Sequence, residues 1–365
     1  MFIGVLRFFR LLSTLLGLLA AGLIIYVLLT DSSYFSSYLE PVRSQVLKGD
    51  GFFTVPLHSR RTATYVTATL GDTNNASLAQ NSVHFLIDSG SDHFWVRDHL
   101  ITQSDARLSP NRFAVEYAGG NASGVQGEAT FFLGSLNWTQ RVGVVDSVSP
   151  QLKEVHSVVG VSRKCRDPKL CVLPHWQLKE SVLSFVYDIG KEDGRFLAGH
   201  LDESLCKQSM KWLPVADSFY WNTEAQMFVA NERLGDEKLR AVWDTGTSFL
   251  YLSSKLYERV TRKVPTKNEP CNLRSLPTIE LEFQGQRFQL PGNIYASLNL
   301  DKTCSYQLGL LDSRWVATIG AEILIGWVFI QAHYVALHVD KDAVGICAHQ
   351  DLSSSSFRAF RVRHS

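Results

Sequence analysis

The stretch FLIDSGSDHFWV, residues 85–96, decides how this chain folds. An apolar, strand-like run ends there on a carboxylate, Asp88, and the chain then turns through Gly90. The same frame returns in RAVWDTGTSFLYL, residues 240–252, around Asp244. In both copies an apolar run leads into Asp, then Ser or Thr, Gly, and Ser or Thr, before apolar residues resume. This internal repeat predicts two half-molecules of like construction that each present one carboxylate.

A second pair of matching elements supports the repeat. An apolar-apolar-Gly element follows each copy about 70 residues later, with SVVG ending at Gly160 and ATIG ending at Gly320. Asp-Ser-Gly or Asp-Thr-Gly alone is a common turn. Two copies in matched apolar frames are a much stronger signal.

The acidic turns carry the groups that a water-activating site needs. If the two halves meet about a pseudo-twofold axis, Asp88 and Asp244 face each other, and such a pair shares one proton. The ionised partner can then take a proton from water while the neutral one donates to the carbonyl oxygen of the bond attacked. Ser91 and Thr247 stand where their hydroxyls can donate to the outer carboxylate oxygens, which favours an acidic operating range.

From residue 52 onward the sequence has the pattern of short strands and turns that is typical of a β protein. Short segments rich in Val, Thr, Phe and Tyr alternate with Gly, Asn, Asp and Pro, as strands and hairpins do. SSKLYERVTRKV, residues 253–264, is the best helical candidate. The fold class is therefore mainly β, and residues 351–365 are predicted to form a disordered tail.

Composition excludes several classes of protein. The chain has 365 residues, 45% of them hydrophobic and 19% charged, which suits a large globular protein of two lobes. Lys plus Arg (36) nearly balance Asp plus Glu (35), so the net charge of +1 gives no electrostatic footprint for nucleic acid. Neither a C-x-x-C nor an H-x-x-x-H spacing indicates a metal site, and we expect no cofactor.

The first 30 residues are predicted to anchor the chain in a membrane. Residues 11–30, LLSTLLGLLAAGLIIYVLLT, carry no charge and follow Arg7 and Arg10. About 20 apolar residues suffice to cross a bilayer, whereas a signal-peptide core has roughly 7 to 15. With the arginines on the cytoplasmic side, we expect a single-pass type II protein of the secretory or endomembrane system or the cell surface, with a Ser-rich stalk at 31–50. Secretion after signal cleavage is the alternative.

An oxidising lumen makes disulfides the default for the six cysteines, although six allow 15 pairings. Spacing favours Cys165 with Cys171 and Cys271 with Cys304, and elimination leaves Cys206 with Cys347. Three sequons for N-glycosylation also fit a lumenal chain. They are Asn75, Asn121 and Asn137.

The two acidic motifs resemble those of the pepsin-like family of aspartic endopeptidases. DSGS at Asp88 and DTGTS at Asp244 look like the family's paired active-site motifs, and the two apolar-apolar-Gly elements look like their companions. EYAGGNASGVQG is similar to the family's flap, which would make Tyr117 the flap tyrosine and Trp95 the tryptophan that hydrogen-bonds it. The likeness covers about residues 52–349.

This resemblance implies a bilobal fold of two β lobes related by a pseudo-twofold axis, with a flap hairpin over the site. We place the N-terminal protease lobe at 51–182 and the C-terminal lobe at 183–350. Cys271 and Cys304 fall where many members of the family have a disulfide. The implied substrate pockets, which favour apolar residues at the cleavage point, are lined on the non-primed side by Leu86, Tyr117 and Val158 and on the primed side by Val242 and Ile319.

Several features depart from the family's pattern. The spacing from Asp88 to Tyr117 is short, which implies a trimmed N-terminal lobe. Ala321 stands where an acidic residue commonly follows the glycine. Asp92 and His93 are polar residues beside the active-site loop, and we expect them to alter the pH dependence of the dyad. A long basic prosegment is not evident before the first strand.

The sequence therefore predicts an aspartic endopeptidase that acts as a monomer on peptide or protein substrates at acidic pH. In this interpretation Asp88 and Asp244 activate water, and Ser91 and Thr247 support them. The alternative is a catalytically impaired, protease-like membrane protein that binds peptides or partners. The trimmed lobe favours that alternative, whereas the intact acidic motifs count against it.

Overall fold

The computed structural model describes residues 51–60, 63–71, 81–102, 106–190, 192–216, 219–235, 238–265 and 269–349. All of them lie in one compact unit of the chain. Four predicted features lie outside these residues and stay predictions: the anchor at 1–30, the stalk at 31–50, the tail at 351–365 and the sequon at Asn75. Among the described residues no helix is long and apolar enough to span a membrane.

The first of two eight-stranded sheets belongs to the N-terminal half and has the order β2-β3-β4-β9-β5-β8-β7-β6, with a further pairing of β3 and β7. Its strands are β2 (His58–Arg60), β3 (Ala63–Leu70), β4 (Asn81–Asp88), β5 (Phe94–Arg97), β6 (Ala106–Tyr117), β7 (Gly120–Leu133), β8 (Leu136–Val148) and β9 (Ser157–Gly160). β4 and β9 run parallel, which places Asp88 beside Gly160. The long antiparallel hairpin of β6 and β7 lies at the edge of this sheet.

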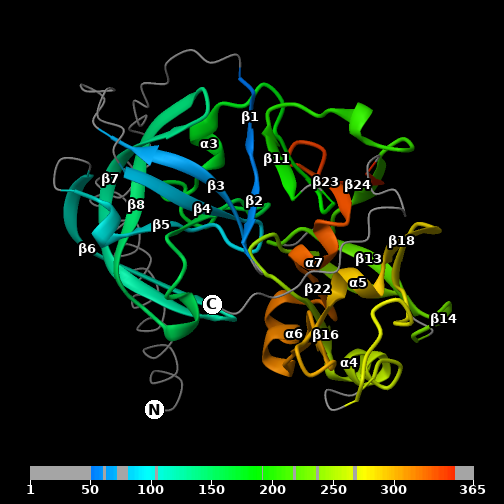
Figure 1. Ribbon diagram of the computed structural model, residues 1–365. Helices are drawn as coiled ribbons and strands as arrows, with labels where there is room; N and C mark the ends of the chain where they lie inside the picture. Colours follow the sequence, from blue (N-terminus) through cyan, green and yellow to red (C-terminus); the bar gives the residue numbers. More distant parts are fainter. Residues whose placement is uncertain are drawn as a thin grey trace, which may run out of the picture. The chain divides into compact units, whose positions relative to one another are not determined.

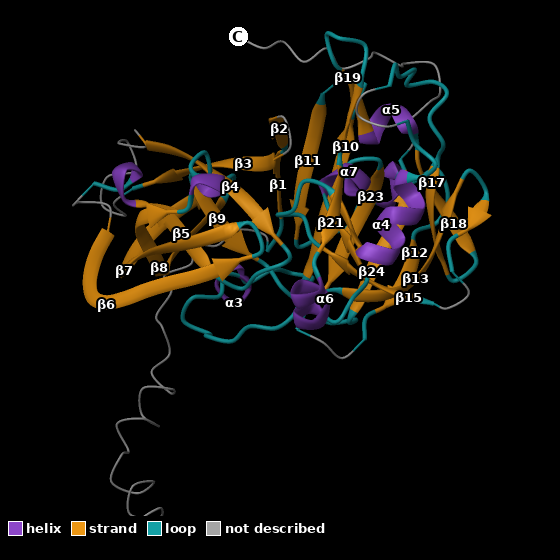
Figure 2. Ribbon diagram, turned by 90° about the horizontal axis from the view of Figure 1, so that it is seen from below, coloured by secondary structure: helices purple, strands orange, loops and turns teal. Residues whose placement is uncertain are grey.

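The second eight-stranded sheet belongs to the C-terminal half and has the order β18-β17-β13-β15-β22-β16-β21, with β14 paired to β13. Its strands are β13 (Asn222–Val229), β14 (Glu232–Arg233), β15 (Leu239–Trp243), β16 (Leu250–Ser253), β17 (Ile279–Phe283), β18 (Gln286–Leu290), β21 (Leu308–Leu311) and β22 (Ile323–Ile325). β15 and β22 run parallel, as β4 and β9 do in the first sheet. Both views show the two sheets on opposite sides of this part of the molecule (Figure 1 and Figure 2).

A six-stranded sheet of order β1-β11-β10-β23-β24-β12 joins the two halves. Its strands are β1 (Phe53–Pro56), β10 (Val182–Asp188), β11 (Asp193–Ala198), β12 (Lys211–Pro214), β23 (His333–His338) and β24 (Ala343–Ala348). β1 belongs to the predicted N-terminal lobe, yet it pairs with β11 beyond the predicted boundary at residue 182. The fold is mainly β and bilobal, as predicted, but the two lobes share a sheet that crosses that boundary.

Helices are few and short in the described residues. They are α3 (Leu173–Trp176), α4 (Ser254–Thr261), α5 (Gly292–Tyr295), α6 (Ser313–Ile319) and α7 (Trp327–Ile330), with 3-10 turns η2 (Asp98–Leu100), η3 (Pro150–Leu152) and η4 (Glu203–Leu205). α4 confirms the predicted helix within 253–264 and buries Leu256 and Val260, which are four residues apart on one face. A two-stranded sheet of β19 (Ala296–Leu298) and β20 (Cys304–Tyr306) completes the fold.

The hydrophobic core explains why the acidic motifs begin as strands. Phe85 and Phe94, which flank the first acidic turn, are fully buried and pack against Phe131 and Trp138 from the β7–β8 hairpin. Trp243, which precedes the second acidic turn, is also fully buried and packs against Phe283. Large apolar side chains on both sides thus hold each acidic turn rigidly against its sheet.

Candidate active site

The two acidic turns have the same construction. Asp88 is the last residue of β4, and Asp244 directly follows β15. The backbone N–H of Gly90 donates to Oδ1 of Asp88 (2.9 Å), and the N–H of Gly246 donates to Oδ1 of Asp244 (2.9 Å). The predicted repeat is therefore present at the level of single hydrogen bonds.

The two predicted supporting hydroxyls lie where the sequence places them. Ser91 Oγ donates to Oδ2 of Asp88 (2.5 Å), and Thr247 Oγ1 donates to Oδ2 of Asp244 (2.6 Å). In each half, one carboxylate oxygen accepts from a backbone amide and the other accepts from a hydroxyl. Hydrogen bonds of this kind favour the ionised form of a carboxyl group.

The glycines of the two turns face the carboxyl group of the opposite half. A Cβ atom added to Gly90 would lie 2.6 Å from Cγ of Asp244, and one added to Gly246 would lie 2.4 Å from Oδ1 of Asp88. A side chain at either position would displace the opposite carboxyl group, because real Cβ atoms essentially never approach other atoms so closely. The glycines are what allow the two carboxyl groups to come together.

A reciprocal hydrogen-bond network, which the sequence reasoning missed, holds the two turns together. The N–H of Ser89 donates to Thr245 Oγ1 (3.0 Å), and the N–H of Thr245 donates to Ser89 Oγ (2.9 Å). Each hydroxyl in turn donates to a carbonyl of the other half, from Thr245 to Ile87 (2.6 Å) and from Ser89 to Trp243 (2.9 Å). The signal was available, because a hydroxyl residue follows the Asp in both copies of the repeat.

The companion glycine of the C-terminal half is Gly326, so the prediction of Gly320 is wrong. Trp243 of β15 pairs with Ile325 of β22, and the N–H of Asp244 donates to the carbonyl of Ile325 (2.9 Å). A Cβ on Gly326 would lie 2.7 Å from the carbonyl oxygen of Thr247, just as one on Gly160 would lie 2.6 Å from that of Ser91.

Gly320 instead ends α6 in the left-handed conformation, with φ of 66°. The departure predicted at Ala321 therefore falls outside the motif, whose glycine is followed by Trp327.

The electrostatics of the pair favour a shared proton. Burial raises the pKa of Asp88 well above its usual range, and the charge of Asp244 raises it further. The hydrogen bonds from Ser91 and Gly90 act in the opposite direction but do not offset the burial. A carboxyl group with a raised pKa beside a second one keeps one proton on the pair over an acidic range.

The predicted flap tyrosine lies at the end of the β6–β7 hairpin, where Tyr117 pairs with Gly120. Trp95 Nε1 donates to the hydroxyl of Tyr117 (2.8 Å), so the predicted contact between these two residues is present. Burial and the charge of Asp88 raise the pKa of Tyr117, which places its ring within electrostatic reach of the pair.

The predicted pocket residues gather in two apolar clusters, one in each half. Leu86 and Tyr117 are partly exposed and pack with the buried Val158. Val242 and Ile319 are 1% and 8% exposed and pack together in the other half. The grouping matches the predicted division into two sides, while the contact of these residues with substrate stays a prediction.

Comparison with known proteins agrees with this geometry. The sequence profile described as eukaryotic aspartyl protease matches residues 77–349. The chain belongs to that family. It is therefore an aspartic-type endopeptidase, as predicted.

Individual relatives are distant but match over most of their length. Pepsin A from Gallus gallus is 23% identical over 314 residues, which are 77% of this chain and 84% of the relative. The vacuolar aspartic protease of Candida albicans is 24% identical over 302 residues, 72% of this chain and 70% of the relative. The crystal structure of the aspartic proteinase from Irpex lacteus superposes with a TM-score of 0.68 at 18% identity, and the match covers 84% of this chain and 100% of that one.

Asp92 departs from the symmetry of this aspartyl protease site. Its carboxylate is 4% exposed, accepts a hydrogen bond from the backbone N–H of Arg166 (2.7 Å) and pairs with the guanidinium of Arg166 (3.2 Å). Nδ1 of His93 lies 3.2 Å from the same carboxylate, and burial lowers the pKa of that imidazole although the charge of Asp92 opposes the shift.

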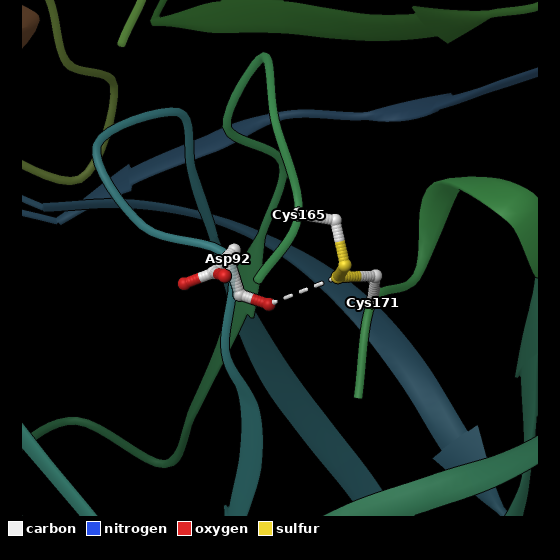
Figure 3. Close-up of side chains that lie close together, drawn as sticks. All are labelled: Asp92, Cys165 and Cys171. Carbon is white, nitrogen blue, oxygen red and sulfur yellow. Dashed lines mark hydrogen bonds between the residues drawn. A yellow bond between two sulfur atoms is a disulfide. The ribbon is translucent and has the colours of Figure 1, made fainter. Parts of the chain in front are cut away.

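The disulfide of Cys165 and Cys171 lies beside Asp92 (Figure 3). Cys171 Sγ is 3.8 Å from the backbone carbonyl oxygen of Asp92, across the dashed line of that view. Two cysteines and a carboxylate in one place resemble a metal site. Because both sulfurs are bonded to each other, neither can act as the thiolate ligand that zinc requires.

The remaining cysteines confirm the other two predicted pairs, Cys206 with Cys347 and Cys271 with Cys304. Three disulfides indicate an oxidising compartment, which places the chain in the secretory pathway. Of the described sequons, Asn121 is exposed in β7 near the hairpin turn, and Asn137 is partly exposed in β8. Their glycosylation stays a prediction.

Proposed function

We propose that Asp88 and Asp244 are the catalytic dyad of an aspartic endopeptidase. The observation that carries this proposal is that each acidic turn packs its glycine against the carboxyl group of the other half. The matched amide and hydroxyl donors to both carboxyl groups support the same conclusion. Asp88 is buried and Asp244 half-buried, and burying carboxyl groups so close together costs free energy. Two turns with a purely structural role would not need these groups.

The chemistry follows from one proton shared by two carboxyl groups. The ionised member takes a proton from a water molecule, whose oxygen attacks the peptide carbonyl carbon, while the neutral member donates its proton to the carbonyl oxygen. In the tetrahedral species that forms, the carboxyl group that took the water proton donates it to the amide nitrogen, and the C–N bond breaks. The other carboxylate takes a proton from one hydroxyl of this species, so an amine and a carboxylic acid leave and the pair again holds one proton. The hydroxyls of Ser91 and Thr247 hold the outer oxygens so that both carboxyl groups keep their orientation.

This mechanism sets an acidic working range. Because burial and the charge of Asp244 raise the pKa of Asp88, the pair keeps its shared proton as the pH falls below neutral. Activity should decline as the pH rises through the raised pKa and the shared proton is lost. Apolar clusters in both halves, which include Leu86 and Val242 two residues before the acidic turns, support a preference for apolar residues at the cleavage point.

The proposal is tested by incubating the purified protein with a mixed peptide library from pH 3 to pH 7, with and without a statine-type transition-state analogue. We expect cleavage at acidic pH that the analogue blocks and that Asp88→Ala and Asp244→Ala abolish. Asp146→Ala removes an exposed carboxylate of β8 and is the matched control, which should retain activity. Cleavage that survives in either dyad variant would overturn the assignment.

We also propose that the protease acts as a monomer and is held by its N-terminal segment at a membrane, with the site on the lumenal side. The uncharged stretch at 11–30 behind Arg7 and Arg10 supports anchoring, and the three disulfides support a lumenal site. The two halves of one chain supply both carboxyl groups and their donors, so the dyad is complete without a second copy, which supports a monomer. Alkaline extraction of membranes, followed by protease protection of sealed vesicles, separates an anchored lumenal protein from a secreted one.

A further inference from the structure

The segment RKCRDPK, residues 163–169, carries four basic residues out of seven in a chain whose net charge is only +1. The disulfide of Cys165 and Cys171 closes residues 165–171 into a small loop, and Arg163 and Lys164 directly precede it. This loop lies beside the first acidic turn, because the N–H of Arg166 donates to the carboxylate of Asp92 (2.7 Å) and the N–H of Ser162, just before the loop, donates to the carbonyl of Ser91 (2.9 Å). A cationic loop, closed by a disulfide and lying beside the first acidic turn, is a candidate for binding an anionic group of the substrate.

Arg166 is the residue of this loop that is held in a fixed orientation. Asp92 binds its backbone N–H (2.7 Å) and its Nη2 atom (3.2 Å), and the guanidinium carbon lies 4.2 Å from the ring centre of Phe219. Phe219 comes from the C-terminal half of the chain, so the guanidinium lies where the two halves meet. An arginine fixed from two sides loses little conformational entropy when it binds an anion.

The guanidinium still has donors to offer. The side chain of Arg166 is 62% exposed, and in the described part of the chain its Nε and Nη1 atoms have no hydrogen-bond partner. The other arginine of the segment, which lies just before the loop, differs, since Arg163 is 8% exposed and its Nε donates to Asp342 (2.7 Å). Arg166 is therefore the guanidinium of the loop that is both oriented and accessible.

Tyr220 connects Arg166 with the dyad. It follows Phe219, whose ring it contacts edge to face at 5.0 Å, and it packs with Val242 beside the second acidic turn. Burial raises the pKa of Tyr220, the charges of Asp244 and Asp88 raise it further, and the charge of Arg166 opposes them. One side chain thus lies within electrostatic reach of both the dyad and the guanidinium.

We propose that Arg166 is a specificity-determining residue that selects substrates with a carboxylate side chain within three residues of the cleaved bond. This inference rests on the proposed function, because it names the substrate class of the same site. Arginine suits the task, since its planar fork of N–H donors matches the geometry of a carboxylate. Asp92 acts here as a positioning residue that holds the guanidinium from the side away from solvent.

The experiment compares pairs of peptides that differ only by Glu or Gln at one position, for three positions on each side of an apolar cleavage point. At pH 5.5 the Glu side chain is ionised, because its ordinary pKa is about 4.3. We expect kcat/KM to favour Glu by about fivefold at one or two positions, the size of one exposed charge-assisted hydrogen bond. In R166A this ratio should fall below about 1.5, and in R166K part of it should return.

Lys169→Ala is the matched control, because it removes one positive charge from the same loop and should keep the Glu preference. If Lys169→Ala lowers the ratio as much as R166A, the preference comes from general electrostatics and the assignment to Arg166 is wrong. A wild-type enzyme that cleaves Glu and Gln peptides equally at every position would also overturn it.

Titration calorimetry with statine-type peptides in Glu and Gln versions separates this inference from the proposed function. If no peptide is cleaved at any pH, the proposed function fails, yet the ratio of the two dissociation constants still reports on Arg166. A Glu preference in binding that R166A removes supports the inference even then. Equal dissociation constants refute it.

Discussion

Replacing Thr245 by Val tests whether the hydroxyl network between the two acidic turns holds the site together. Val has nearly the shape of Thr, so the change removes the hydroxyl without leaving a large cavity. The N–H of Ser89 would lose its acceptor, and the carbonyl of Ile87 would lose a donor at 2.6 Å. Ser89 and Thr245 are 0% and 2% exposed, so water cannot replace the lost partners.

The magnitude follows from these contacts. A buried N–H without an acceptor costs about 1–3 kcal/mol, and the lost bond to the carbonyl adds about 1 kcal/mol, so the free energy of unfolding should fall by about 2–4 kcal/mol. Ser89→Ala removes the mirror-image pair of hydrogen bonds and should cost a similar amount. In each turn the Asp stands between the carbonyl residue and the hydroxyl residue of this network. Loss of the hydroxyl should therefore displace the carboxyl groups and lower kcat/KM by about 100-fold, the loss expected when catalytic groups move by about 1 Å.

Urea unfolding at a fixed pH, with the disulfides intact, measures the stability change, and peptide cleavage measures the change in kcat/KM. Thr139→Val is the control, since its hydroxyl pairs with that of Thr130 (2.7 Å) at a partly exposed place where water can substitute. The control should cost no more than about 1 kcal/mol. If Thr245→Val is no more harmful than Thr139→Val in stability and leaves cleavage intact, the network does not join the two turns in the way we describe.

Three further predictions concern the dyad and the flap. Gly90→Ala should lower kcat/KM by about 100-fold, because the new Cβ would lie 2.6 Å from Cγ of Asp244. Gly71→Ala is the control and should retain activity, since its Cβ would lie 3.4 Å from a ring carbon of Phe132. Equal activities of the two variants would contradict the steric argument. Because the pKa of Asp88 is raised, its contribution to stability is complete below its unfolded pKa and is lost as the pH rises through its folded pKa. Asp88→Asn should therefore stabilise the protein more at pH 7 than at pH 3, as measured by urea unfolding. An equal change in the free energy of unfolding at both pH values would count against burial as the cause. Tyr117→Phe removes the acceptor of the hydrogen bond from Trp95 and should lower kcat/KM about fivefold to tenfold with little change in stability. Unchanged kinetics would show that Tyr117 is not the flap tyrosine.

The repeated acidic frame was enough to predict two like halves and the place of the acidic pair, whereas the bilobal fold with its flap was implied by the resemblance to the aspartic endopeptidases. Apolar residues on both sides of Asp88 and Asp244 specify buried strands, and a Gly two residues later specifies a tight turn. These are local patterns, and the structure reproduces them down to matched amide and hydroxyl donors. Disulfide pairing by spacing succeeded for a similar reason, since Cys165 and Cys171 are only 6 residues apart.

Non-local pairing is where the sequence reasoning failed. Gly320 and Gly326 both follow apolar residues, and only the register of β22 against β15 shows that Gly326 is the glycine beside the acidic turn. Similarly, β1 lies in the sheet that joins both halves because its register matches β11, about 140 residues away. Neither pairing leaves a local pattern in the chain, because strands of this composition can pair in many registers.

Comparison of the two halves shows which residues serve the shared chemistry and which are particular to this protein. Four residues after each proposed catalytic carboxylate, the N-terminal half has Asp92 and the C-terminal half has Ser248. The chemistry of a shared proton needs no carboxylate there, since the second half has none. A buried carboxylate would be costly at that place without a partner, and Arg166, 74 residues away in sequence, is the partner that offsets the cost. The symmetric chemistry therefore does not require the ion pair of Asp92 and Arg166. The pair fixes an exposed guanidinium where the two halves meet, which supports our proposal that Arg166 takes part in substrate selection.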